Sequence, residues 1–196
     1  MSIDAAVAAL RAGGVVVFPT ESVYGIGVDA CSTAAVDHLV RVRGRDDGKP
    51  LLVLVRDLAM AALMVTALPP AAARLAARFW PGPLTLVLPA RADLPAAVTA
   101  GTGTIGVRVS SDPLAAQLVD TFGSPLTAPS ANPPGAPSAT SVAAARDYFG
   151  ASVDAYLDGG TRNGGASTVA VVEGNTVRVL RPGPITADAL NRALED

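Results

Sequence analysis

Short apolar runs alternate with amphipathic, alanine-rich segments along the whole chain. Because buried strands are short and helices repeat their apolar face every 3.6 residues, the two kinds of segment can be told apart. The apolar runs predict strands at 14–18, 23–28, 50–55, 83–88, 105–109, 125–128 and 153–160, and a hairpin over 167–180 that turns at Gly174-Asn175. The amphipathic segments predict helices at 4–12, 33–43, 57–66, 70–79, 113–121, 140–150 and 185–196.

This alternation indicates an α/β fold. Several connections between predicted strands are too short for a helical crossover, so the sheet should mix parallel and antiparallel pairs. We find no internal repeat and no change of composition that would mark a linker, and we expect a single domain over residues 1–196. The Pro- and Ala-rich segment 129–139 follows a strand directly and is expected to be an ordered loop.

Composition and charge narrow the class of protein. The chain has 196 residues, of which 50% are hydrophobic and 16% charged, as expected for a globular protein. No apolar run reaches the roughly 18 residues that span a membrane. Asp4 and Arg11 interrupt the N-terminal segment where a signal peptide needs an apolar core, so a cytoplasmic location without membrane contact is expected. The net charge of −2 gives no bulk attraction to nucleic acid.

Several common sites are excluded. With one cysteine, Cys31, and one histidine, His38, the chain has neither a disulfide framework nor a Cys/His zinc site. His38 lies in a helical pattern and is expected to be structural or solvated. Cys31 is expected to be a small buried residue, although its position before a helix could lower its pKa. The G-x-G-x-x-G match at 101–106 leads into a strand instead of a helix, which argues against dinucleotide binding and favours a turn near a ligand.

Hydroxyl groups and cations collect where predicted strands end. Ligands of α/β sheets bind at strand ends, and this combination suits a polyanion. Arg108 lies among valines within a strand, where its charge needs either an internal partner, Glu21 or an aspartate, or an anionic ligand; Arg181 favours the ligand. Pro19 to Ser22 either faces such a site or makes a tight turn between strands. The candidate residues are Thr20, Ser22, Tyr24, Arg43, Arg45, Lys49, Thr104, Arg108, Ser130, Asn132, Ser138, Ser167 and Arg181.

Seven short motifs occur in an order that resembles the YrdC-like family, the threonylcarbamoyl-AMP synthases. The resemblance covers residues 4–192 and favours the short, single-domain form of the family. It implies a twisted mixed α/β sheet with flanking helices around a large concave cavity. The motifs are FPTESVYGIGVDA, RGRDDGKPLLVLV, WPGPLTLVL, IGVRV, PLTAPSANPPGAPSAT, STVAVV and VRVLRPG.

The resemblance implies that L-threonine, bicarbonate and ATP are condensed to threonylcarbamoyl-AMP and pyrophosphate, which serves N6-threonylcarbamoyl modification of adenosine 37 in ANN-reading tRNAs. Arg43, Arg45 and Lys49 would hold the triphosphate and act in catalysis. Arg108 would bind the threonine carboxylate. The remaining nucleotide contacts would be Thr104, Ser130, Asn132, Ser138 and Arg181, and the remaining amino-acid contacts Thr20, Ser22, Tyr24 and Ser167. Mg²⁺ would be bound mainly through the ATP phosphates, without protein ligands of its own.

The sequence departs from the family pattern at a few positions and leaves other functions open. Arg43 stands where lysine is usual, and Leu54 where many members have histidine. The downstream tRNA threonylcarbamoyl-transfer machinery is the implied partner, and contact with tRNA or double-stranded RNA remains open. One alternative is a module that handles carbamoyl-adenylate. Another is a non-catalytic double-stranded RNA-binding protein of ribosome assembly, which the acidic pI disfavours.

Overall fold

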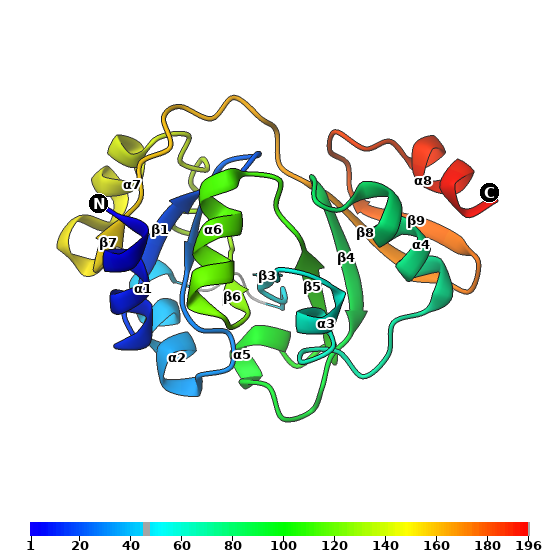
Figure 1. The fold of residues 1–196 in the computed structure, drawn as a ribbon, viewed down its shortest axis with the longest axis horizontal. Coiled ribbons are helices and arrows are strands. Elements are labelled where there is room, and N and C mark those ends of the chain that lie inside the picture. The colour runs from blue at the N-terminus through cyan, green and yellow to red at the C-terminus, as the bar shows by residue number, and fades with distance from the viewer. Residues whose placement is uncertain (45–47, 196) are drawn as a thin grey trace.

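Two β-sheets form the centre of this computed structural model, which describes residues 1–44 and 48–195. The smaller sheet has the order β2-β1-β7 and the larger one β6-β3-β5-β4-β8-β9 (Figure 1). Parallel pairs (β1 with β7, β3 with β5, β4 with β8) occur beside antiparallel ones, so the predicted mixed sheet is confirmed. The strands are β1 (Val16–Pro19), β2 (Tyr24–Gly27), β3 (Leu52–Leu54), β4 (Leu84–Pro89), β5 (Thr104–Arg108), β6 (Leu126–Thr127), β7 (Ala155–Tyr156), β8 (Thr168–Glu173) and β9 (Thr176–Arg181).

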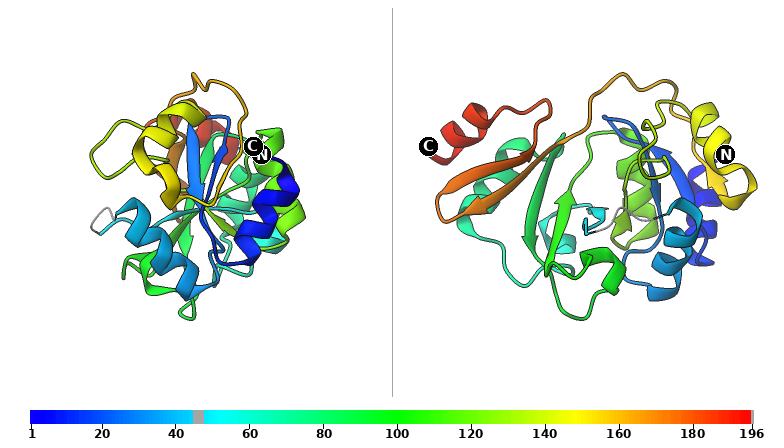
Figure 2. Two further views of the ribbon diagram at one scale, coloured as in Figure 1. Left: turned by 90° about the vertical axis from the view of Figure 1, so that its left-hand side faces the viewer. Right: turned by 180° about the vertical axis from the view of Figure 1, so that it is seen from behind.

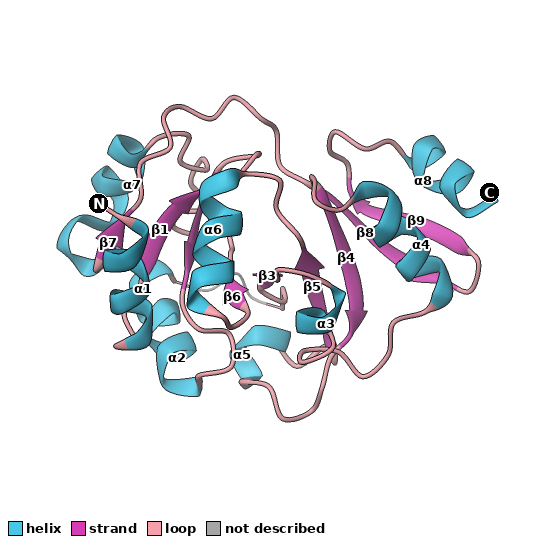
Figure 3. Ribbon diagram, in the orientation of Figure 1, coloured by secondary structure: helices cyan, strands magenta, loops and turns pink. Residues whose placement is uncertain are grey.

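Helices flank both sheets, and Figure 3 shows how they cover the ends of the elongated molecule. α1 packs on α6 beside the smaller sheet, whereas α4 packs on α8 beside the larger one. The helices are α1 (Ile3–Arg11), α2 (Thr33–Arg43), α3 (Leu58–Ala61), α4 (Pro70–Phe79), α5 (Ala96–Thr99), α6 (Pro113–Phe122), α7 (Val142–Phe149) and α8 (Ala187–Glu195), with a 3₁₀ turn at Gly150–Ser152.

Local signals set most helix boundaries. The Ser32 hydroxyl accepts a hydrogen bond from the Ala35 amide and begins α2, as predicted. Asp112 begins α6 in the same way, followed by Pro113 at the first helical position. α6 ends at Gly123, whose φ of 79° is a conformation that glycine adopts without steric cost. The helix predicted at 70–79 and the hairpin turn at Gly174-Asn175 are also confirmed.

Two helices differ from the predicted elements. The helix predicted at 57–66 is the single turn α3, because Val65 pairs with Ala90 and the Thr66 amide donates to the Pro89 carbonyl. These contacts draw the chain towards the end of β4. The one-turn helix α5 was not predicted, since four residues are too few to show a helical period.

Of the three connections that run between the described strands of the two sheets, one contains α2 and the other two contain long loops. The loop 129–139 is ordered along β2: the Tyr24 amide donates to the Ala139 carbonyl, and the Ala131 amide to the Tyr24 carbonyl. Residues 157–167, which we call the β7–β8 connection, run as a loop from the smaller sheet to the larger one. Both views in Figure 2 show this segment along the outside of the molecule. The hollow described below lies where these connections and the strand ends meet.

The remaining sequence expectations have mixed outcomes. Cys31 is exposed, so the expectation that it is buried was wrong: the turn before α2 lies at the surface. Partial desolvation, with Asp29 nearby, raises the pKa of its thiol instead of lowering it. His38 is half-buried with Nδ1 3.4 Å from the Gly13 carbonyl oxygen, a structural position. None of the helices in the described part of the chain is long and apolar enough to cross a bilayer.

Candidate functional site

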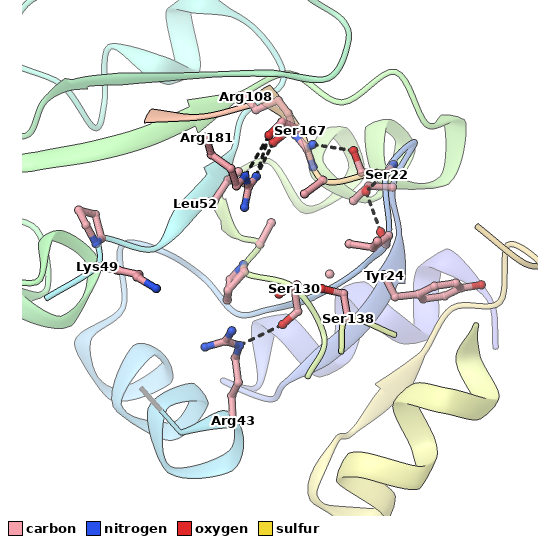
Figure 4. A pocket seen from close by; sticks show the side chains of 17 residues that line it. Ser22, Tyr24, Arg43, Lys49, Leu52, Arg108, Ser130, Ser138, Ser167 and Arg181 are labelled. Carbon is pink, nitrogen blue, oxygen red and sulfur yellow. Dashed lines mark hydrogen bonds between the residues drawn. The ribbon is translucent and has the colours of Figure 1, made fainter. Parts of the chain in front are cut away.

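A pocket of about 190 Å³ lies between the two sheets, and residues from distant parts of the chain form its walls (Figure 4). The described lining residues include hydroxyl groups and cations but no carboxylate. Ten of the thirteen candidates predicted from sequence are among them: Thr20, Ser22, Tyr24, Arg43, Lys49, Arg108, Ser130, Ser138, Ser167 and Arg181. The concave cavity that the family resemblance implies is therefore present, with cations on several of its walls.

Arg108 forms one corner of the pocket at the end of β5. Its Nη1 lies 2.9 Å from Glu21 Oε1, and the two side chains are only 4% and 15% exposed. The angle at this contact is not that of a hydrogen bond, whereas Nη1 also donates to Ser22 Oγ at 3.4 Å. Desolvation lowers the pKa of Arg108 and the Glu21 carboxylate opposes the shift. The internal partner is thus Glu21, yet Arg108 Nε is buried without a hydrogen-bond partner and remains a donor for an anion.

Ser167 and Arg181 form the adjoining wall, contributed by the start of β8 and the end of β9. Arg181 Nη2 donates to Ser167 Oγ at 3.0 Å and to the Ser167 carbonyl at 2.9 Å. The Ser167 hydroxyl also lies 2.9 Å from the hydroxyl of Thr85 on β4. Solvent reaches the side chain of Arg181, but partial desolvation still lowers its pKa. These contacts hold the Ser167 hydroxyl in one place at the pocket wall.

Two cations approach from the opposite side. Figure 4 shows Arg43 and Lys49 pointing towards the hollow that Arg181 enters from the other wall. Arg43 ends α2 and is buried, and its Nε donates to the Ser130 carbonyl at 3.0 Å. Lys49 is exposed to solvent, as expected for an ammonium group at the mouth of a pocket. Arg45, predicted beside them, lies outside the described residues.

Thr20 and Tyr24 line the pocket, but their hydroxyl groups have structural partners. Thr20 Oγ1 donates to the Val23 carbonyl and accepts from the Ser22 amide, which closes a tight turn. The segment from Pro19 to Ser22 therefore both faces the pocket and makes a tight turn between strands. The Tyr24 hydroxyl donates to the Gly160 carbonyl at 2.8 Å and accepts from the Gly159 amide at 3.0 Å. It holds the β7–β8 connection while its ring points away from the hollow (Figure 4).

Two predicted nucleotide contacts and one predicted turn lie outside this lining. Asn132 is buried, and its amide group donates to the Pro133 and Ala136 carbonyls of its own loop. Thr104 shares a sheet face with Arg108 because alternate strand residues point the same way, but it is four residues, about 13 Å, further along β5. The glycine turn at 101–103 precedes Thr104 and is likewise remote from the pocket.

Sequence reasoning missed two groups that support the site. Thr85 carries a hydroxyl within an otherwise apolar, buried strand, and this polar position was the sequence signal that could have identified it. Ser110 donates a short hydrogen bond to Glu21 Oε2 and accepts one from the Asp112 amide at 3.2 Å. Leu54, where the family resemblance implied a lost histidine contact, is buried in the core and is not among the lining residues.

Comparison with known proteins finds close relatives over most of the chain. The family named Sua5/YciO/YrdC, described as telomere recombination, matches residues 8–183. A threonylcarbamoyl-AMP synthase of Bacillus subtilis is 39% identical over 194 residues, covering 98% of this chain and 56% of that protein. The crystal structure of Pyrococcus abyssi Sua5 complexed with L-threonine is 35% identical with a TM-score of 0.92, covering 97% of this chain and 56% of that one. Escherichia coli YciO is 30% identical with a TM-score of 0.83, covering 93% and 89%.

The resemblance seen in the motifs is therefore confirmed, as is the fold class. The chain spans just over half the length of the Bacillus and Pyrococcus relatives. The extent of a single domain over residues 1–196 stays a prediction. With a match over residues 8–183 and identities of 35–39% to proteins that align with nearly all of it, this chain belongs to the Sua5/YciO/YrdC family.

Proposed function

We propose that this protein is an ATP-dependent L-threonylcarbamoyl-AMP synthase, a nucleotidyltransferase. The observation that carries the proposal is the pocket itself. A buried guanidinium with two serine hydroxyls forms one corner, and further cations face it across the same hollow. The corner suits the carboxylate of an amino acid, and the cations suit a triphosphate. The name of the Bacillus relative and the L-threonine in the Pyrococcus structure support the choice of substrates.

The reaction requires positioning and charge neutralisation more than a base. The unprotonated threonine amine adds to CO₂ from bicarbonate and a proton passes to solvent, which gives a carbamate that is already an anionic nucleophile. A carbamate oxygen bonds to the ATP α-phosphorus, the bond from that phosphorus to the bridging oxygen breaks, and pyrophosphate leaves. Arg108 with Ser22 and Ser167 would fix the amino acid, while Arg43, Arg45 and Lys49 would stabilise the charge on the phosphates.

The nucleotide would extend from the cationic wall along β5 of the larger sheet towards Thr104. Ser130, Ser138 and Arg181 line the pocket. Thr104 lies on the same sheet face as Arg108, and Asn132 would act by shaping its loop. Mg²⁺, when present, would neutralise part of the triphosphate charge. The described lining residues fit a metal that arrives on phosphate oxygens, since they offer hydroxyls but no carboxylate.

The product is expected to serve the tRNA threonylcarbamoyl-transfer machinery, and the protein is expected to act in the cytoplasm. The test is pyrophosphate release from ATP with bicarbonate and one amino acid at a time. Release with threonine, but not with serine or valine, and loss of release without bicarbonate are the expected results. Lys49→Met should raise the KM for ATP, whereas Arg178→Met on the outer side of β9 should change nothing. No release with any amino acid contradicts the proposal.

A further inference from the structure

The β7–β8 connection contributes a wall of the pocket although it has no secondary structure of its own. Its last residues, Ala166 and Ser167, line the pocket. At its start, Tyr24 holds Gly159 and Gly160, and at its end Arg181 holds Ser167. The hydrogen bond within this loop, from the Gly160 amide to Asp158 Oδ1 at 2.9 Å, lies near its start. The rest of the eleven residues needs a further attachment, because a loop segment without regular hydrogen bonding samples many conformations.

The attachment in the middle is an ion pair. Arg162 Nη2 donates to Asp112 Oδ2 at 2.6 Å, and the two side chains are 21% and 6% exposed. The Arg162 amide also donates to the Thr140 carbonyl at 2.8 Å. The guanidinium packs against Gly159, since a Cβ atom there would overlap Arg162 Nη2 and the Pro19 ring. Removing one member of such a pair is more disruptive than breaking the exposed ion pairs of this protein, because the remaining charge is left with little water around it.

Asp112 is itself fixed in place. Its other oxygen, Oδ1, accepts hydrogen bonds from the amides of Leu114 and Ala115 and begins α6. Its amide donates to Ser110 Oγ, and Ser110 donates to Glu21, the partner of Arg108. The anchor of the connection and the carboxylate that orients Arg108 therefore belong to one continuous chain of polar contacts.

The connection also lies directly on the turn that carries Ser22. A Cβ atom on Gly164 would be 2.5 Å from the Glu21 carbonyl oxygen and 3.1 Å from Ser22 Cα. Only glycine permits this close approach, so the connection rests on the backbone beneath the Arg108 corner. A shift of the connection would displace Ser167 relative to Ser22, the two hydroxyls assigned to the amino acid.

From this arrangement we infer that Arg162 is a positioning residue: through Asp112 it holds the β7–β8 connection in the conformation that completes the amino-acid side of the pocket. This inference rests on the proposed function for its kinetic part only. Arg162 does not line the pocket, and it acts by raising the fraction of molecules whose Ser167 wall is in place. Affinity for the amino acid falls in proportion to that fraction.

The first test needs no substrate. Hydrogen exchange in Arg162→Gln should rise about tenfold or more at the amides of residues 159, 160 and 162, which donate hydrogen bonds within segment 158–166, with little change in α4 or in β4 and β5. Asp112→Asn keeps an oxygen for the α6 amides and should give the same local effect. The double variant should exceed neither single variant by more than about twofold, because both remove one interaction. Arg178→Gln, which breaks the exposed pair with Glu173, is the matched control.

The second test is kinetic. In Arg162→Gln the KM for threonine should rise about five- to tenfold, with the KM for ATP and kcat within about twofold, and Arg162→Lys should recover part of the loss. Unchanged exchange over residues 158–166, a uniform rise over the whole chain, or multiplying effects in the double variant would each overturn the inference. If no amino acid supports pyrophosphate release, the proposed function fails, while the exchange results still decide the role of Arg162.

Discussion

The pair between Arg108 and Glu21 allows a quantitative test of how the pocket corner is built. Replacing Arg108 by methionine keeps an unbranched apolar stem but leaves the Glu21 carboxylate, 15% exposed, without its counter-ion. Removing one member of a buried pair costs about 3–5 kcal/mol. Because Ser110 still donates to Glu21, we expect about 3 kcal/mol, at the low end of that range.

The partner substitution defines the coupling. Glu21→Gln keeps an acceptor for Ser110 and for Arg108 and should cost about 2 kcal/mol. The double variant removes both charges and should lose only about 2 kcal/mol, so the two single losses exceed it by about 3 kcal/mol. The assay is urea unfolding followed by the fluorescence of Trp80, the single tryptophan. Arg178→Met, which breaks an exposed pair, should cost no more than about 0.5 kcal/mol.

The same variants test the role of the corner in binding. Arg108→Met should raise the KM for threonine at least tenfold and leave the KM for ATP within about twofold, because only the amino acid meets this corner. Single losses that add up in the double variant, within about 0.5 kcal/mol, would show that the two charges do not depend on each other. Equal changes in both KM values would remove Arg108 from the carboxylate role.

Three further predictions concern stability. Tyr24→Phe leaves the Gly159 amide without its acceptor and should cost about 1–3 kcal/mol. Burial raises the pKa of Tyr24, so the unfolded chain loses the phenolic proton at a lower pH than the folded protein. The free energy of unfolding should therefore decline above about pH 10. An equally steep decline in Tyr24→Phe would contradict this. Leu75→Ala, at a fully buried site on α4, should cost about 2–5 kcal/mol in urea unfolding, whereas Leu63→Ala at an exposed site should stay within about 0.5 kcal/mol. Gly27→Ala should cost about 1–3 kcal/mol and lower the melting temperature, since its Cβ would overlap a carbonyl oxygen of β6; a melting temperature equal to the parent would show that the strands can separate there.

The sequence by itself determined the class of fold and most of its elements. Apolar runs, the capping residues Ser32 and Asp112, and the turn at Gly174-Asn175 act within a few residues, so they can be recognised without knowing the rest of the chain. The same local logic located the hydroxyls and cations at strand ends. It did not locate α5 or limit α3, because four residues show no period and Val65 is drawn away by a contact with Ala90.

Only the tertiary structure decided which side chains meet. Ser22 and Arg108 are 86 positions apart, and Arg162 and Asp112 are 50 apart; each pair depends on the order of strands in the sheets. Sequence left Arg108 with Glu21, an aspartate or a ligand as partner, and strand packing selected Glu21. Tertiary packing also turned the side-chain amide of Asn132 towards its own loop. Hydrogen bonds and ion pairs act over about 3 Å, so their partners are fixed by the fold and not by spacing along the chain.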